Sequence, residues 1–538
     1  MLFIYYPLIL ISILGFGFFT SKKIIKLNNL NLGYQGIIGI FFLLLISYIT
    51  TQFIAHNEIF NSIILIIGII LFIFYFKQFN INKANAKLLI ILFILSLIFI
   101  LVGKNHDDFH YYHFPYIITL IEYSHPIGLG NLNHGFKTHS SIFLLSSLFS
   151  LPGAKYNLFH LAPVYILLFS NFVLLKLIFN KKIFKNEIFV IYLSLASFTF
   201  INIFFSRLGE HGTDKSAMIL IILLLVNYIY FVNKKIESID SNYLKIFTII
   251  FTIIISLKAM YIIYIILFIP LIIHVYNKKN SISLFFNVNL FYCLLLLGFV
   301  ILTNFFNTGC LLFPEKKTCF FDMPWSLSLD TVEYLRIHYE NWAKAGSGAG
   351  YALKQADKLN YISNFNWVEN WIEKFFFNKV SDFIYALFFM SIIFVTLFKS
   401  SKSQIIYKRN YILIFFLLLA ILTIWFLVHP LLRYGGYHLF FLIIFIPLSF
   451  FLEKFNKGIK NLDRKILTIV MITAFVFIGR NASRLAKEYK IYSYNPLINV
   501  NYPIKGGKSG SFRMQKRIEK IINEKKAKKI YKNRYMFF

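Results

Sequence analysis

A series of long apolar runs, separated by short basic connectors, is the feature that most limits what this chain can fold into. Runs such as 63–76, 188–205 and 411–428 approach the roughly 20 residues with which a helix crosses about 30 Å of hydrocarbon. In lipid the backbone must form its hydrogen bonds within its own segment, so each run predicts a helix. Only 14% of the residues are charged and 58% are hydrophobic, whereas about a quarter are charged in a soluble domain. The sequence therefore predicts an all-α fold, a polytopic transmembrane helical bundle.

The apolar runs predict about fourteen spans. The spans are expected near 2–20, 35–54, 59–76, 88–102, 158–178, 187–205, 216–232, 245–257, 259–276, 284–304, 380–398, 410–428, 437–452 and 466–479. The first run lacks a basic region before it and a small-residue cleavage site after it, so we interpret it as a retained helix rather than a signal peptide. Residues 1–479 are thus expected to form one multi-pass domain, followed by a basic C-terminal tail at 480–538.

Lysine and arginine are concentrated in one set of connectors, and this gives an orientation, because cytoplasmic loops carry an excess of these residues. The connectors assigned to the cytoplasm contain Lys22-Lys23, 77–87, Lys181-Lys182-Lys185, Lys234-Lys235, Lys278-Lys279, 399–409 and 454–465. The expected orientation places the N-terminus outside. The formal net charge of +32 then reflects topology and contact with anionic lipid, and nucleic acid is not an expected partner.

The same assignment gathers the unusual polar segments on the outer face. These segments are the first large loop 103–157, the loop 206–215, a hinge at Lys258, the second large loop 305–379, the segment 429–434 and the tail. Within the first loop, 139–152 is apolar but short, which predicts a helix lying at the membrane interface. The second loop holds Trp325, Trp342, Trp367 and Trp371, interpreted more readily as interface anchors than as ligand contacts. Its glycine-rich run at 346–350 suits either a mobile lid or a plain linker.

Two of the three cysteines lie in the second outer loop. Cys310 and Cys319 are close in sequence, and Cys293 falls inside an expected span. In a periplasm-like compartment a disulfide between Cys310 and Cys319 is expected, with two free thiols as the alternative.

The densest group of ionisable residues is the run from His106 to His113 at the mouth of an expected span. Such groups are costly to desolvate and indicate function at a membrane boundary. One aspartate could cap a helix, which leaves the second of Asp107 and Asp108 unexplained. A divalent metal held by His106, Asp107 and His110 is one alternative, because histidines four residues apart share a helix face. An acid–base role is the preferred interpretation, since burial and a like-charged neighbour raise the pKa of a carboxylate.

Further candidate residues come from the other outer segments. The loop after the sixth expected span contains Arg207, Glu210, His211, Asp214 and Lys215. Lys258 interrupts an apolar stretch, and His429 and Arg433 follow a span; each of these could extend to lipid headgroups or bind a substrate phosphate. No Gly-rich phosphate loop or nucleophile elbow occurs in the sequence. An activated donor would therefore have to be embedded in the membrane already.

The combination of an early acidic pair, many spans and later basic residues resembles the GT-C superfamily of integral-membrane glycosyltransferases. More closely, Asp108-Phe109-His110-Tyr111-Tyr112-His113, Gly128-Leu129-Gly130-Asn131-Leu132 and Pro430-Leu431-Leu432-Arg433-Tyr434 are similar to motifs of a group of uncharacterised bacterial multi-pass proteins. The similarity covers roughly 85–440. Lys137 stands near where that group has an arginine, and a lysine cannot reproduce a bidentate grip on phosphate.

The resemblance implies a GT-C-like fold and transfer of a sugar from a polyprenyl-phosphate donor to a lipid or glycan acceptor of the cell envelope, with inversion. In that mechanism Asp108 is the general base and Asp107, or a metal, orients it. The residues expected to bind substrate are His110, His113, Lys137, Arg207, Glu210, Asp214, Lys258, His429 and Arg433. Two other classes remain open at this point: a transporter or flippase for a lipid-linked glycan, and an O-antigen-type polymerase or ligase.

Overall fold

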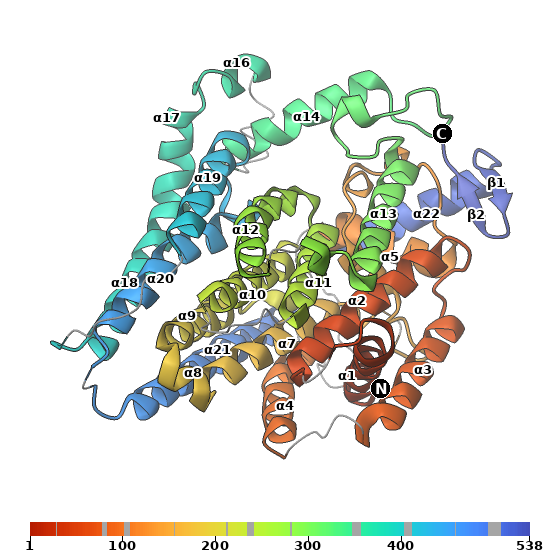
Figure 1. Cartoon of the computed structure of the whole chain (residues 1–538). Coiled ribbons are helices and arrows are strands. Elements are labelled where there is room, and N and C mark those ends of the chain that lie inside the picture. The colour runs from red at the N-terminus through yellow and green to blue at the C-terminus, as the bar shows by residue number, and fades with distance from the viewer. Residues whose placement is uncertain are drawn as a thin grey trace.

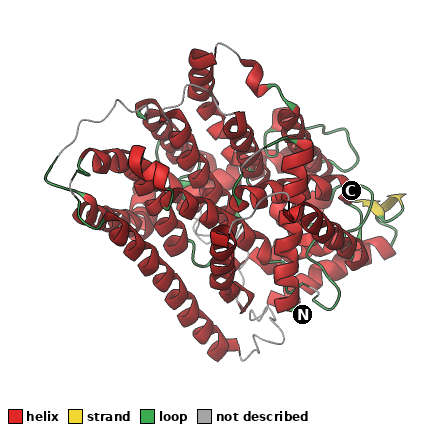
Figure 2. Cartoon of the chain, turned by 60° about the horizontal axis from the view of Figure 1, so that its bottom comes forward, coloured by secondary structure: helices red, strands yellow, loops and turns green. Residues whose placement is uncertain are grey.

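The chain folds into a bundle of helices with one small pair of strands near its C-terminal end (Figures 1 and 2). The structure is a computed structural model that describes residues 1–27, 30–77, 83–101, 108–154, 156–210, 213–233, 241–279, 282–346, 357–402, 411–457, 459–492 and 507–538. The predicted all-α fold class is confirmed. His106, Asp107 and His211 lie outside the described residues.

The helices of the N-terminal half are α1 (Leu2–Phe19), α2 (Leu32–Thr51), α3 (Glu58–Phe76), α4 (Lys83–Ser96), α5 (Phe114–Glu122), α6 (Ser141–Ser147), α7 (Leu161–Ile178), α8 (Lys181–Asn186), α9 (Ile188–Phe204), α10 (Asp214–Asn233) and α11 (Ser241–Leu257). Those of the C-terminal half are α12 (Phe268–Lys279), α13 (Val288–Thr308), α14 (Leu329–Lys344), α16 (Lys358–Ile362), α17 (Val368–Trp371), α18 (Ser381–Phe398), α19 (Ile412–Val428), α20 (Gly436–Lys454), α21 (Leu462–Tyr492) and α22 (Gly507–Asn523). The strands β1 (Lys528–Tyr531) and β2 (Arg534–Met536) form an antiparallel pair.

Short tighter or wider helical turns join several of these helices. The 3₁₀ turns include η6 (His134–Phe136), η7 (Leu208–Glu210), η8 (Ala259–Leu267) and η12 (Leu432–Tyr434), and the π-helical turn η4 (Phe109–His113) leads into α5.

Eleven helices in the described part of the chain are long and apolar enough to cross a membrane. Three shorter apolar helices, α9, α11 and α19, occupy three further segments expected to span. The chain therefore has the character of a multi-pass membrane protein, whereas the number of spans stays a prediction. The predicted boundary between residues 479 and 480 falls inside α21, which runs on to Tyr492.

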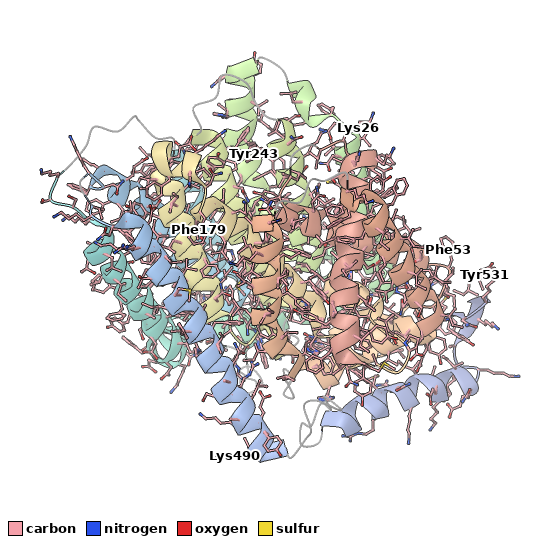
Figure 3. All side chains as sticks on the ribbon, turned by 90° about the horizontal axis from the view of Figure 1, so that it is seen from below. Lys26, Phe53, Phe179, Tyr243, Lys490 and Tyr531 are labelled. Atoms are coloured by element: carbon pink, nitrogen blue, oxygen red, sulfur yellow. A yellow bond between two sulfur atoms is a disulfide. The ribbon has the colours of Figure 1, made fainter. Side chains whose placement is uncertain are left out.

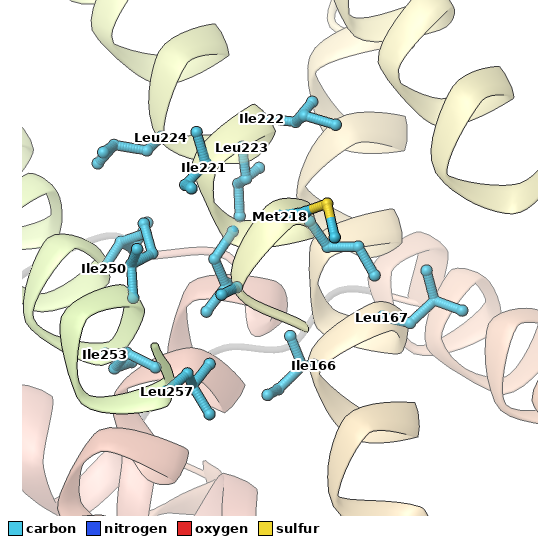
Figure 4. Close-up of a cluster of buried hydrophobic side chains, with 14 of the residues drawn as sticks. Ile166, Leu167, Met218, Ile221, Ile222, Leu223, Leu224, Ile250, Ile253 and Leu257 are labelled. Atoms are coloured by element: carbon cyan, nitrogen blue, oxygen red, sulfur yellow. The ribbon is translucent and has the colours of Figure 1, made fainter. Parts of the chain in front are cut away.

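The helix α10 forms the centre of the bundle, because its apolar window is completely buried. Figure 4 shows Met218 and its neighbours on α10 packed between Leu167 of α7 and Ile250 of α11. By contrast, only 17% of the apolar window of α3 is buried, as expected for a helix that faces lipid. The first residue of α10, Asp214, is thus attached to the most buried of these candidate spans.

Small residues let α1, α2 and α3 approach closely. A Cβ atom added at Gly15 would lie 1.9 Å from the carbonyl oxygen of Gly68 on α3, and one added at Gly39 would lie 2.0 Å from that of Ile13. Such close approach of backbones is typical of helix pairs in membranes, where packing replaces the hydrophobic effect between helices. The three N-terminal helices therefore form a tightly packed unit.

Two expectations for the outer loops are wrong. The helix α6, predicted within 139–152 to lie at the membrane interface, has all seven residues buried and packs in the protein interior. Trp367 and Trp371 were interpreted as interface anchors, but they are 1% and 5% exposed. The loop 305–379 is also largely helical, since it contains α14, α16 and α17. Of its glycine-rich run only Gly346 is among the described residues.

Cys310 and Cys319 form a disulfide that closes the turn after α13. The helix ends at Thr308, and Gly309 follows with a φ of 80°, in the left-handed region that favours glycine. Cys293 is a buried free cysteine within α13.

The C-terminal tail packs on the first large loop. The backbone N–H of Ile127 donates to Tyr535 O at 2.8 Å, and that of Phe537 donates back to Ile127 O at 2.8 Å. Arg534 Nη2 donates to Gln52 Oε1 at 3.1 Å, directly after α2 ends. Figure 3 shows Lys490 and Lys26 at opposite ends of the bundle. The tail thus lies on the face of the first loop and away from the first basic connector.

Candidate active site

A cleft opens where five of the segments assigned to the outer face meet. Its cavity volume is about 250 Å³, and it is partly open to solvent. Its lining consists of Tyr112, Lys137, Thr138, His139, Ser140, Phe143, Thr213, Leu257, Lys258, Ala259, Met260, Asn304, Phe313, Pro314, Tyr339, Trp342, His429 and Tyr434. Segments separated by more than 300 residues therefore build one site.

The pair formed by Lys258 and Asp214 lies at one wall of this cleft. Asp214 is the first residue of the central helix α10, where the helix dipole favours a negative charge. Lys258 is an extended residue between α11 and the 3₁₀ turn η8, at the predicted hinge. Its Nζ lies 2.6 Å from Asp214 Oδ1, and the two side chains are 28% and 20% exposed. Burial opposes the charge on Lys258, but Asp214 and Tyr434 together outweigh this effect, so the pKa of Lys258 is raised.

Two cations lie close to the ring of Tyr434. The Lys258 ammonium is 5.2 Å from the centre of its ring, and the Arg433 guanidinium carbon is 4.9 Å away. Arg433 Nη2 also donates to Tyr434 Oη at 3.0 Å. Burial lowers the pKa of Arg433, but Tyr434, Asp214 and Asp108 together raise it above its usual value. Two cations and a phenol are thus concentrated at one edge of the cleft.

Two indoles hold the backbone that carries Arg433. Trp371 Nε1 donates to Pro430 O at 2.8 Å, and Trp425 Nε1 donates to Leu431 O at 2.9 Å. Buried carbonyls need such partners. These tryptophans fix the turn between α19 and α20, and with it the position of Arg433.

Asp108 lies beside this group at the start of η4. It occupies the N-cap position of that turn, but its side chain accepts no capping bond there. Burial raises the pKa of Tyr112, and the negative charges of Asp108 and Asp214 raise it further, which places both carboxylates within electrostatic reach of one phenol. The ring of Tyr112 packs against Gly135, where an added Cβ would lie 2.2 Å from a ring carbon. The first loop therefore orients Tyr112 by direct packing.

Lys137 and His429 are two further ionisable residues in the lining. Burial lowers the pKa of Lys137, and burial also lowers that of His429. Desolvation disfavours the charged form in both cases. A bound anion would favour the charged form of Lys137.

A known family model matches all the segments that build this cleft. The family model described as "Domain of unknown function (DUF8201)" matches residues 1–441. The chain belongs to the DUF8201 family. No curated protein and no solved structure matches the chain. The DUF8201 match contains every residue of the cleft and ends inside α20, so α21 and the tail lie beyond it.

Several residues predicted to bind substrate lie close together in this DUF8201 chain. Lys137, Lys258 and His429 line the cleft, and Asp214 and Arg433 interact directly with residues that line it.

Other predicted residues are not part of the lining. His110 and His113 are 6% and 3% exposed, and their rings pack against Phe109. Arg207 is exposed at the end of α9. The backbone of Glu210 ends η7, but its side chain is not among the described parts.

The predicted metal site receives no support from the DUF8201 structure. Among the described residues, no group of three or more histidine, cysteine, aspartate or glutamate side chains is placed to hold a metal ion. His106 and Asp107 lie outside those residues, so this alternative stays a prediction.

Sequence analysis missed the aromatic wall of the cleft. Tyr339 and Trp342 lie three residues apart on α14 and therefore on one helix face. The segment alternates polar and apolar residues with a helical period, which is the signal that could have indicated an amphipathic helix. His139 also lines the cleft, but its ring nitrogens already face Tyr48 Oη at 3.1 Å and Asn304 Oδ1 at 3.0 Å.

Proposed function

We propose that the chain is a membrane glycosyltransferase of the GT-C type. It would transfer a sugar from a polyprenyl-phosphate donor to a cell-envelope acceptor on the outer face of a bacterial inner membrane. The observation that carries this proposal is the meeting of Asp108, Asp214, Lys258 and Arg433 around one cleft at the end of an apolar bundle. Carboxylates and cations in a partly desolvated cleft are suited to general-base catalysis and to phosphate binding.

The proposed reaction is a single displacement. The Asp108 carboxylate accepts the proton of an acceptor hydroxyl, and the hydroxyl oxygen attacks the anomeric carbon of the donor sugar. The bond between that carbon and the phosphate oxygen breaks, and the phosphate leaves with the electron pair. The configuration at the anomeric carbon is thereby inverted, and the proton ends on Asp108.

The cations have a defined task in this step. Negative charge develops on the departing phosphate, and preorganised positive groups stabilise it. Arg433 offers a planar guanidinium whose Nε is buried without a hydrogen-bond partner among the described residues. Lys258 is held charged by Asp214, and Lys137 provides a third ammonium in the lining.

Replacing the proposed base tests the function directly. Full-length protein in liposomes with labelled polyprenyl-phosphate sugar and a crude envelope acceptor should transfer sugar, and Asp108→Asn should lower the rate by at least about 10²-fold. Asp322→Asn, an exposed residue of the second outer loop, serves as the matched control and should leave the rate unchanged. Near-normal transfer by Asp108→Asn would rule out this base. Movement of label across the bilayer without transfer would instead favour a flippase.

Arg433→Ala addresses the donor side. It should weaken use of the donor, with a rise in donor KM, because the guanidinium is proposed to bind the donor phosphate. A donor KM equal to that of the wild type would remove this role from Arg433.

A further inference from the structure

The aromatic wall formed by α14 differs in chemistry from the rest of the cleft. Tyr339 and Trp342 carry no charge, whereas Lys258, Arg433 and the two aspartates lie on other elements. A single ligand that contacts both parts would need an anionic portion and a neutral, partly apolar portion. The site therefore has two subsites of different character.

Both aromatic residues have a buried donor that no described residue satisfies. These atoms are Tyr339 Oη and Trp342 Nε1. Buried polar groups in proteins nearly always have partners, so an exception in a cleft points to a ligand that supplies them. The two atoms belong to residues on one helix face, so one ligand could pair with both.

The surroundings fix the orientation of this face. The Tyr339 ring lies 5.4 Å from that of His134 in the first loop and 6.4 Å from that of Phe313 beside the disulfide. At the far end of α14, Lys344 Nζ donates to Glu340 Oε1 at 2.6 Å and to Ile362 O at 2.9 Å. The second half of the helix is thus secured by contacts on several sides, and its aromatic face is preorganised for binding.

We propose that this face of α14 is a binding subsite for a neutral saccharide, the hydroxyl-rich acceptor. The assignment of this saccharide as the acceptor rests on the proposed function, whereas the expectation that a saccharide binds rests on the side chains of Tyr339 and Trp342. A sugar ring has an apolar C–H face, which suits an aromatic ring, and a rim of hydroxyls, which can pair with Tyr339 Oη and Trp342 Nε1. A lipid tail fits less well, because hydrocarbon over these two donors would leave both without a hydrogen bond.

Direct binding of simple glycosides tests the subsite without any donor. Full-length protein in detergent is mixed with methyl glycosides of glucose, galactose, mannose and N-acetylglucosamine, and saturation-transfer NMR measures binding. At least one glycoside should bind, and Tyr339→Phe and Trp342→Phe should each weaken it by about 5- to 10-fold, the effect of one lost hydrogen bond. Tyr334→Phe, on an exposed part of the same helix, is the matched control and should have no effect.

The outcomes separate this inference from the proposed function. If no glycoside binds, or if neither variant weakens binding, the subsite is refuted. If glycosides bind as expected but no sugar is transferred from a polyprenyl-phosphate donor, the proposed function fails and the subsite stands. If transfer occurs and Tyr339→Phe and Trp342→Phe leave the acceptor KM unchanged, the function stands and the subsite fails.

Discussion

The Lys258–Asp214 pair gives a prediction whose magnitude follows from the structure. At 2.6 Å and an effective dielectric constant of about 20, the gross attraction is about 6 kcal/mol. Desolvation of both groups offsets much of this gain, because each side chain is mostly buried. We therefore expect a net coupling of about 1–3 kcal/mol between the two side chains.

A double-mutant cycle measures that coupling. Asp214→Asn should lower the free energy of unfolding, because it leaves the Lys258 ammonium in the cleft without its counter-ion. Adding Lys258→Met should recover part of the loss. The assay is unfolding by SDS in mixed micelles, followed by tryptophan fluorescence.

The Lys316–Glu333 pair provides the control for this cycle. Its side chains are 50% and 39% exposed, and exposed pairs typically contribute less than about 1 kcal/mol. A coupling for Lys258–Asp214 no larger than that of the control pair would refute the reasoning, since it would mean that solvent screens the charges in the cleft.

Three further predictions concern packing, hydrogen bonding and pH. Gly15→Ala should destabilise the protein by about 1–3 kcal/mol or prevent folding, because the added Cβ would meet a backbone oxygen. Gly298→Ala is the control and should be tolerated, because Gly298 has open space around it. Equal yields of monodisperse protein for the two variants would contradict this packing. Trp371→Phe should cost about 1–3 kcal/mol by leaving Pro430 O without its donor, and an unchanged unfolding midpoint would argue against that bond. Burial lowers the pKa of His429 below its ordinary value near 6.5, so its contribution to stability is present above about pH 6.5 and is lost as the pH falls through the folded-state pKa. The stability of His429→Asn should therefore fall less steeply than that of the wild type between pH 7.5 and 5. An identical slope for the two proteins would show that this imidazole is not involved.

The fold class was predictable because apolar periodicity reports directly on burial in lipid. Lys137, Lys258 and His429 line one cleft, which agrees with the prediction from the basic connectors that their segments share a face. The same reasoning missed Tyr339 and Trp342, because α14 is too polar to be recognised as a span.

Other features depended on contacts that no local pattern encodes. Trp371 carries the same sequence signal whether it faces a membrane interface or donates to Pro430, and only the tertiary contact decides. His110 and His113 are spaced as a metal site would be, but they pack as core residues against Phe109. The position of the tail depends on bonds such as that from Arg534 to Gln52, which are 482 residues apart in sequence.

The packing of the C-terminal tail on the first large loop has a consequence for how the protein folds. Gly128, with a φ of 79°, leaves so little room that an added Cβ would lie 2.0 Å from the carbonyl oxygen of Phe537. The loop that follows carries Lys137 into the cleft, yet its partner residues in the tail follow every candidate span of the described chain in the sequence. The candidate membrane helices can therefore insert before the tail packs against the loop that lines the cleft. Assembly of the site becomes a late, post-insertion step, whose rate should depend on delivery of the tail to the same face.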